Sequence, residues 1–207
     1  MYAPSRPPRV IAAMLTPCLK PGEPDLDELG RWAATLVRGG CDGLFVASST
    51  GELPMLGRVQ RGAMVAAAKA AAGEDAVVYA GVSATGVGEV LACADEAAAA
   101  GADVAVAMAP FFLKLTPAEL QAYFLELADA CPLPLALYHH LRMPTAIDVA
   151  TATRLARHPH VAGMKDSARD VERISAVSAA APAGQWAVYQ GSEYFILESL
   201  ERGAAGC

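Results

Sequence analysis

The sequence predicts an α/β fold, a (β/α)8 TIM barrel that is truncated after its seventh βα unit. Two observations predict this class. Short runs rich in Val, Ile and Leu alternate about seven times with longer Ala-rich segments whose apolar residues recur at helical spacing. The short runs are also apolar almost throughout, which is typical of parallel strands that are buried on both faces.

The length of the repeat separates two architectures. A doubly wound open sheet would also alternate strands with helices. Each unit of this chain spans about 30 residues, however, and a (β/α)8 barrel of ~250 residues divides into eight such units. The even repeat therefore favours the barrel.

The individual elements follow from the apolar runs and from helix-capping residues. Asp25, Thr116 and Asp170 are good N-caps, and Thr116 precedes a proline that suits the first helical turn. Helices are expected to begin near Asp25, Arg58, Gly86, Thr116, Ala146, Asp170 and Glu193. Strands are expected at Val10–Pro17, Gly43–Ser48, Ala76–Val82, Asp103–Pro110, Pro134–His140, Val161–Ser167 and Trp186–Ser192.

The chain divides into a short N-terminus and one domain. Residues 1–9 are proline-rich and expected to be flexible, and residues 10–207 are expected to form the barrel domain. The segment Glu201–Cys207 comes where the seventh helix should end and an eighth strand should begin. The domain is therefore expected to lack strand 8, and a seven-stranded barrel has an open seam with two unpaired edges.

Composition excludes several functions. The 207 residues are 54% hydrophobic and 18% charged, which suits one compact domain, and the net charge of −6 argues against nucleic-acid or anionic membrane partners. The N-terminus lacks the apolar core of a signal peptide, and no segment is long and apolar enough to span a bilayer, so we expect a cytoplasmic protein. The five cysteines and four histidines show no metal-site spacing, so no metal is expected.

Lys165 is the most informative residue of the chain, because it interrupts the otherwise apolar run Val161–Met164. Burial favours the neutral form of a lysine, and a neutral amine is the nucleophile of Schiff-base chemistry. The alternative is a lysine at a strand end whose stem covers apolar surface while its ammonium reaches water. The ends of the other strands help to separate these interpretations.

Polar residues follow five of the predicted strands. In a (β/α)8 barrel, catalytic groups lie at the C-terminal ends of the strands and in the loops that follow, so these residues are expected to converge. The polar strand ends are Thr16–Pro17, Ser48–Glu52, Tyr138–His140, Lys165–Ser167 and Gln190–Glu193.

This set of motifs resembles the dihydrodipicolinate synthase and N-acetylneuraminate lyase family, the pyruvate-type class I aldolases. The resemblance covers nearly the whole chain. A single Lys-Asp-Ser would be a weak signal, whereas five motifs in the same order make chance similarity unlikely. The matching motifs are Leu15–Pro17, Ser48–Leu56, Leu137–Tyr138, Gly163–Ser167 and Gly191–Glu193.

The resemblance implies a role for each matching residue. Lys165 would form a Schiff base with the carbonyl of a 2-oxo acid, and Tyr138 would carry protons to and from the bound substrate. Ser49, counted with these two among the catalytic residues, belongs with Thr50 to the carboxylate-binding loop of the family. Gly51 and Gly191 would complete the substrate-binding set; a glycine in the loop lets backbone approach a ligand closely.

Three departures from the family pattern bear on the substrate. The family's tyrosine after strand four is replaced within Ala109–Phe112, and phenylalanine cannot relay a proton. The proline after the catalytic tyrosine is replaced in Tyr138–Pro144, and Arg142 lies one position earlier than the family's arginine. Relative to the family, the eighth strand and the C-terminal helices are also expected to be missing from residues 1–207. We therefore expect a substrate outside lysine biosynthesis, with His139 and Arg142 as candidate substrate contacts.

Together, these features predict a Schiff-base-forming lyase that acts on pyruvate or another 2-oxo acid. Two alternatives stay open: a sugar-acid dehydratase that uses the same lysine imine, and a catalytically incompetent binder of 2-oxo acids. No cofactor is expected, because the imine itself serves as the electron sink. The resemblance implies a homotetramer or homodimer.

Overall fold

The computed structural model describes residues 9–180 and 186–207. The described chain forms two compact units. One unit comprises Val10–Val106 and Cys131–Pro134, and will be called the N-terminal unit. The other comprises Arg9, Ala107–Ala130 and, within Leu135–Cys207, the described residues; it will be called the C-terminal unit.

Seven strands form one sheet whose hydrogen-bonded order follows the chain. A doubly wound sheet would reverse its strand order at a switch point, and this sheet has none, so the predicted (β/α) barrel class is confirmed. The pairs β1–β4, β4–β5, β5–β6, β7–β8 and β8–β9 are parallel. In order, the strands are β1 (Ile11–Ala13), β4 (Gly43–Val46), β5 (Val77–Gly81), β6 (Val104–Met108), β7 (Leu135–His139), β8 (Val161–Asp166) and β9 (Ala187–Gln190).

A helix follows each strand of the sheet. The predicted caps are confirmed for Asp25, Thr116 and Asp170, whose side chains accept the backbone N–H three residues further on. The helix expected near Ala146 begins later, because Asp148 provides its cap. The helices are α1 (Leu26–Arg38), α2 (Arg58–Ala72), α3 (Val87–Ala99), α4 (Pro117–Ala130), α5 (Val149–Leu155), α6 (Val171–Ser178) and α7 (Ile196–Glu201), with 3-10 turns η1 (Leu53–Met55) and η2 (Glu193–Phe195).

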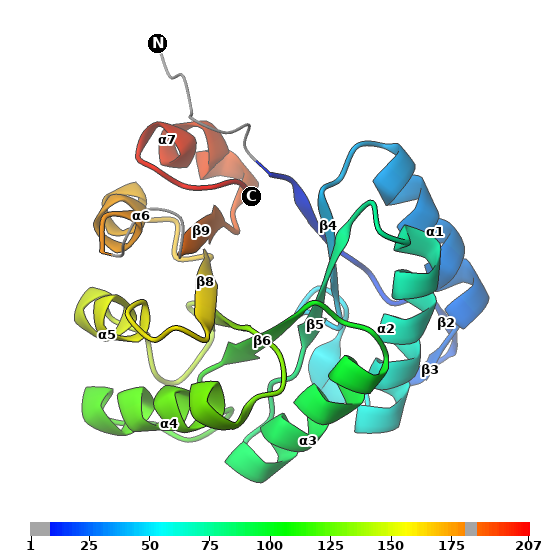
Figure 1. Ribbon diagram of the computed structural model, residues 1–207, viewed down its shortest axis with the longest axis horizontal. Coiled ribbons are helices and arrows are strands. Elements are labelled where there is room, and N and C mark those ends of the chain that lie inside the picture. The colour runs from blue at the N-terminus through cyan, green and yellow to red at the C-terminus, as the bar shows by residue number, and fades with distance from the viewer. Residues whose placement is uncertain (1–8, 181–185) are drawn as a thin grey trace. The chain divides into compact units, whose positions relative to one another are not determined.

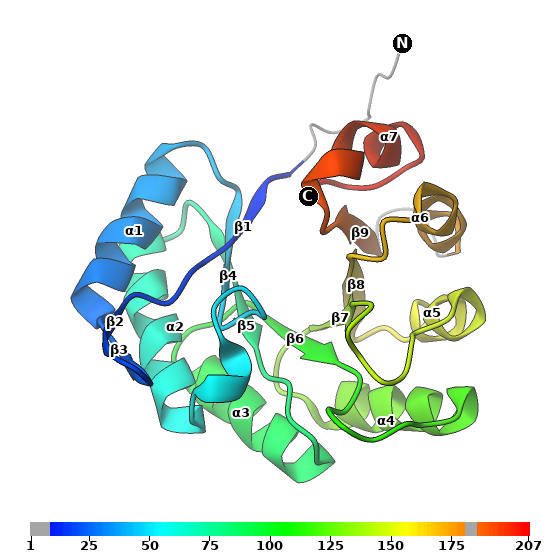
Figure 2. The same cartoon turned by 180° about the vertical axis from the view of Figure 1, so that it is seen from behind.

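In the N-terminal unit, α1 and α2 lie side by side against the strands (Figures 1 and 2). The first predicted strand, Val10–Pro17, is too long: β1 ends at Ala13. The chain then forms a two-stranded antiparallel hairpin of β2 (Cys18–Lys20) and β3 (Glu23–Pro24), which turns at Gly22 with a φ of +75°. A positive φ is easily adopted by glycine, so the local turn chemistry ends the first strand early.

In the C-terminal unit, α4, α5 and α6 form a row beside the strands (Figure 1). Polar contacts join α4 to α5 and to the segment that follows α5. The ring Nδ1 of His160 lies 2.9 Å from the Ala128 carbonyl oxygen, and Arg154 on α5 donates to the Gln121 side chain on α4. These contacts hold α5 and the segment before β8 against α4.

The last residues of the chain pair with β9 and with Arg9. Gly206 forms parallel bridges with both Arg9 and Tyr189. The Arg9 N–H donates to Ala205 O at 3.0 Å, and Arg9 O accepts from the Cys207 N–H at 2.9 Å. Of the N-terminal segment predicted to be flexible, residues 1–8 lie outside the described residues. Gly206 therefore lies beside β9, in the part of the sequence where an eighth strand would begin.

Two further sequence predictions concern covalent links and membranes. All five cysteines are free thiols, in keeping with their scattered positions. Within residues 9–180 and 186–207, no helix has the length and apolar character needed to cross a membrane.

Candidate active site

Three neighbouring strands of the C-terminal unit place a tyrosine, a lysine and a second tyrosine in one row. Tyr138 on β7 is the register partner of Lys165 on β8, and Lys165 is in turn the partner of Tyr189 on β9. Register partners in a parallel sheet project from the same face, so the three side chains lie together. Lys165 Nζ lies 5.0 Å from the centre of the Tyr138 ring. The sequence prediction that Tyr138 faces Lys165 agrees with this geometry.

The amine of Lys165 has an acidity suited to nucleophilic chemistry. Burial lowers the pKa of Lys165 from 10.5 to about 8, because desolvation disfavours the charged form. At pH 7 roughly a tenth of such amines are neutral, against well under a thousandth for an ordinary lysine. A lysine that only extends its ammonium into water would keep its ordinary pKa, so the lowered pKa favours the first of the two sequence interpretations.

Glycine at position 191 lets the chain after β9 approach Lys165. A β-carbon added there would lie 2.0 Å from Ser167 Oγ and 3.0 Å from Lys165 Cε. Both distances are too short for any other residue without movement of the lysine stem or the serine. Gly191, predicted as a substrate-binding residue, therefore has a packing role beside Lys165, and its contact with substrate stays a prediction.

A buried ion pair lies on the opposite face of the same strands. Arg173 Nε donates to Asp166 Oδ2 at 2.6 Å, and the Asp166 and Arg173 side chains are 1% and 11% exposed. Arg173 also donates to the Ile147 carbonyl, while the Ile147 N–H donates to His139 Nδ1 at 3.3 Å. This network links the loop after β7 to β8 and α6, directly behind the lysine.

The two histidines after Tyr138 have different surroundings. His139 is buried beside Asp166, its register partner, and belongs to the network just described. Burial is the main cause that lowers the pKa of His139, and the nearby Asp166 charge opposes this. His140 instead lies on the same side of the sheet as Tyr138, and the centres of the two rings are 5.8 Å apart. Arg142 is exposed, and its backbone N–H donates to His140 Nδ1.

The Ser-Ser-Thr-Gly motif forms a tight turn in the N-terminal unit. Ser49 and Thr50 are exposed at its tip, whereas Ser48 and Gly51 are buried. Thr16 Oγ1 donates to the Gly51 carbonyl at 2.7 Å, so the Leu-Thr-Pro motif holds this turn. A β-carbon at Gly51 would lie 3.0 Å from the Met14 carbonyl oxygen, which explains the glycine by packing within the chain itself.

The backbone around this turn is strained. Ala47, directly after β4, and Glu52, directly after Gly51, have φ values of 51° and 59°. Non-glycine residues rarely occupy the left-handed region, and such residues concentrate at functional sites. Between these two strained residues, the turn exposes Ser49 and Thr50, and with them two hydroxyl groups, at the end of the buried strand β4. Ser49, Thr50 and Gly51 stay predictions as catalytic and substrate-binding residues.

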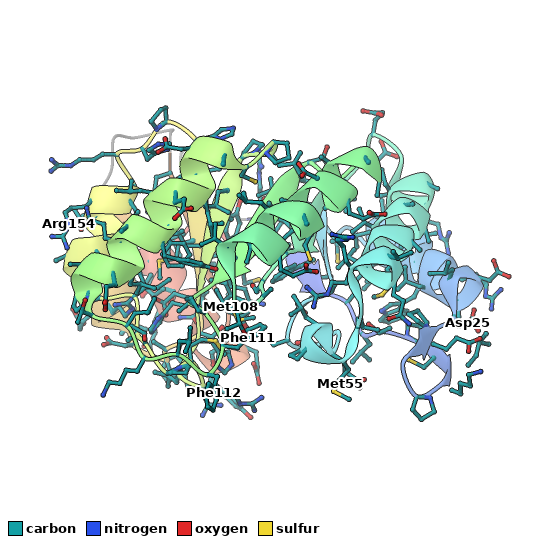
Figure 3. The ribbon with its side chains drawn as sticks, turned by 90° about the horizontal axis from the view of Figure 1, so that it is seen from below. Asp25, Met55, Met108, Phe111, Phe112 and Arg154 are labelled. Carbon is teal, nitrogen blue, oxygen red and sulfur yellow. The ribbon has the colours of Figure 1, made fainter. Side chains whose placement is uncertain are left out.

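The loop after β6 carries the phenylalanines that replace the family's tyrosine. Phe112 is 92% exposed, has a φ of 68° and projects outward from the chain (Figure 3). Its neighbour Phe111 is partly buried. Neither ring has a titratable proton, so this loop supplies no proton relay through these positions.

In the part of the chain that the structure describes, no cluster of three or more His, Cys, Asp or Glu side chains is arranged to hold a metal ion. The site brings together an amine and two phenols on one face, with a histidine at its border.

Sequence reasoning missed Tyr189 and the Asp166–Arg173 pair. Tyr189 lies within a predicted strand, and only the register between β8 and β9 shows that it shares the face of Lys165. The strand period of two was a usable signal for Asp166, because it places adjacent residues on opposite faces. Its arginine partner follows seven residues later on α6, and nothing in the local pattern links the two.

A sheet whose strands run in chain order, each followed by a helix, defines a β/α-barrel protein, and two of its neighbouring strands place a lysine of lowered pKa beside a tyrosine. The model of the Dihydrodipicolinate synthetase family matches residues 6–207. The chain belongs to this family.

Individual relatives agree with this assignment. The chain is 37% identical over 200 residues to a 4-hydroxy-tetrahydrodipicolinate synthase from Synechococcus, covering 96% of this chain and 66% of the relative. It is 37% identical over 199 residues to 4-hydroxy-tetrahydrodipicolinate synthase 1 of Streptomyces coelicolor, covering 96% and 64%. The chain thus spans slightly less than two thirds of the length of these curated relatives.

Solved structures show the same fold. Dihydrodipicolinate synthase from Acinetobacter baumannii, complexed with pyruvate, is 30% identical with a TM-score of 0.91, covering 96% of this chain and 68% of that one. The 2-keto 3-deoxygluconate aldolase from Picrophilus torridus is 25% identical with a TM-score of 0.87, covering 96% and 72%.

Proposed function

We propose that this protein is a Schiff-base-forming lyase of the class I aldolase type, and that its substrate is pyruvate or another 2-oxo acid. The observation that carries the proposal is Lys165, whose pKa of about 8 makes a neutral amine available near neutral pH. Attack of Nζ on the 2-oxo carbon and loss of water would form an imine. The protonated imine then accepts the electron pair released when a bond to the adjacent carbon breaks.

Tyr138 is the proposed proton carrier. Its ring lies beside Lys165 Nζ, so its phenol is within the same group of side chains as the reacting nitrogen. A phenol can both donate and accept a hydrogen bond, which suits a group that passes protons during imine formation and bond cleavage. Ser49 and Thr50, with the backbone at Gly51, are proposed from the family resemblance to bind the substrate carboxylate.

Reductive trapping tests the central claim. The protein is incubated with pyruvate and borohydride, and the site of any adduct is found by peptide mapping. The chain has four lysines, Lys20, Lys69, Lys114 and Lys165, so the other three are internal controls. We expect one adduct, on Lys165, and none in Lys165→Met.

A matched variant guards against nonspecific effects. Lys69 is also partly buried, but it is held by Asp103 at 3.0 Å, so Lys69→Met should trap pyruvate like the parent protein. Circular dichroism of each variant confirms that it is folded. Equal trapping on all four lysines, or unchanged trapping in Lys165→Met, would contradict the proposal.

A further inference from the structure

Tyr189 is the large side chain that β9 places on the face of the lysine site. It is the register partner of Lys165, and a β-carbon at Gly191, two residues further on, would lie 3.0 Å from Lys165 Cε. Gln190 projects the other way, where its side-chain amide donates to Ser199 Oγ of α7 at 2.8 Å. Since side chains alternate along a strand, both contacts place the Tyr189 side chain beside the lysine.

The residues that surround Tyr189 on this face are small. Ala187 and Gly191 lie two residues before and after it, and neither has a side chain larger than a methyl group. On the side away from the lysine, Tyr189 bridges to Gly206, which has no side chain. Any side-chain cover that β9 gives to Lys165 therefore comes from the Tyr189 ring.

Lys165 has little side-chain cover along its own strand. Gly163, two residues earlier on the same face, has no side chain, and Ser167, two residues later, has a short polar one. On the β7 side, the centre of the Tyr138 ring lies 5.0 Å from Lys165 Nζ. The lysine is thus flanked by one aromatic residue on each neighbouring strand.

The acidity of Lys165 depends on this cover. Burial is the cause that lowers the pKa of Lys165 to about 8. The titratable groups that the flanking strands bring to this face are Tyr138 and His140 from β7 and Tyr189 from β9. The carboxylate of Asp166 lies on the opposite face, paired with an arginine. Exclusion of water from Nζ therefore favours the neutral amine, and the flanking rings are the groups placed to exclude it.

We propose that Tyr189 is a positioning residue for Lys165: its ring covers the β9 side of the amine, excludes water there and holds Nζ beside the Tyr138 ring. The value of this cover for catalysis rests on the proposed imine at Lys165, whereas the cover itself does not. The ring performs this role, so Tyr189→Phe should preserve it. Removal of the ring should let water stabilise the charged amine.

Competitive labelling tests the role of the ring without any substrate. Each protein is labelled with trace acetic anhydride over a pH range that spans 8 and 10.5, and peptide mapping gives the labelling rate of each lysine. We expect a midpoint near 8 for Lys165 in the parent protein and in Tyr189→Phe. In Tyr189→Ala, and in Tyr189→Val, which suits a strand, the midpoint should rise by about one pKa unit. Such a rise makes the neutral amine about tenfold scarcer at pH 7, so trapping of pyruvate at that pH should fall about tenfold.

The design separates acidity from access and from folding. A change in access of the reagent alters the labelling rate at every pH and leaves the midpoint unchanged. Tyr194→Ala, which removes a 77% exposed ring from the same unit, is the control and should keep the parent midpoint. Lys69, which is held by Asp103, reports folding, because in an unfolded variant it would be labelled as fast as the exposed Lys20.

The outcomes distinguish this inference from the proposed function. An unchanged midpoint in both Tyr189→Ala and Tyr189→Val, or a rise in Tyr189→Phe as large as in Tyr189→Ala, would overturn the role of the ring. A parent midpoint near 10.5 would overturn the cover itself. Midpoints that shift as expected in a protein that traps no pyruvate would support the role of Tyr189 and overturn the imine proposal alone.

Discussion

Removal of the Asp166 carboxylate is expected to lower the free energy of unfolding far more than removal of an exposed charge. Asp166 Oδ2 accepts from Arg173 Nε at 2.6 Å, and Oδ1 accepts from the Ala168 N–H at 2.9 Å. The Arg173 side chain is 11% exposed, and in Asp166→Ala its remaining partner among these contacts would be the Ile147 carbonyl. Leaving one member of a buried ion pair uncompensated costs about 3–5 kcal/mol.

The magnitude can be compared with the stability of a whole domain. Folded domains are stable by about 5–15 kcal/mol, so this one change would consume a large share of the total. Urea unfolding followed by circular dichroism measures the loss. The charge-neutral double variant Asp166→Leu with Arg173→Leu should lose less than Asp166→Ala alone, because it leaves no buried charge without a partner.

A surface ion pair provides the control. Lys20 and Glu23 form a contact of 2.8 Å, but their side chains are 72% and 47% exposed. Lys20→Ala should therefore change the free energy of unfolding by about 0–1 kcal/mol. A loss in Asp166→Ala no larger than in Lys20→Ala, or a double variant less stable than Asp166→Ala, would refute the reasoning.

Two predictions concern the surroundings of the lysine. The folded-state pKa of Lys165, about 8, lies below its ordinary 10.5, so the unfolded chain binds more protons between these values and stability should rise with pH across that window. Urea midpoints measured from pH 7 to 11 should show this contribution in the parent protein and lose it in Lys165→Met; an identical pH profile in both would contradict it. Gly191→Ala should reduce trapping of pyruvate at least tenfold, since its β-carbon would displace Lys165 or Ser167. Ser167→Ala should partly restore it, and Gly88→Ala, where the added carbon meets nothing within 4 Å, should trap normally.

Much of the fold could be predicted because it depends on local patterns. The apolar runs located all seven sheet strands, and Asp25, Thr116 and Asp170 located three helix starts through short-range hydrogen bonds. Strand ends were overextended by one or more residues, since apolarity continues beyond the last ladder hydrogen bond. The hairpin of β2 and β3 was missed, because its residues form an exposed turn without an apolar run.

The site was predictable where its chemistry lies in one motif, and less so where it depends on register. Lys165 follows from residue type and position in a strand, Tyr138 follows from the family resemblance, and the structure places the two side chains together. The partnership of Lys165 with Tyr189, and that of Asp166 with Arg173, depends on how separate elements align. The sequence suggested His139 as a candidate substrate contact, whereas the structure places His139 beside Asp166 and brings His140 against the Tyr138 ring.

Lys165 and Asp166 project from opposite faces of β8, so the chemical character of each face depends on the register of this strand. One face of this strand presents an amine whose pKa is lowered by burial, and the other presents a carboxylate that is paired with Arg173. A slip of one residue would exchange these faces, placing a carboxylate among the tyrosines and an amine beside a buried guanidinium. Both exchanges are electrostatically unfavourable. The same pair of residues that supplies the reactive group therefore also penalises the misfolded register in which that group would be lost.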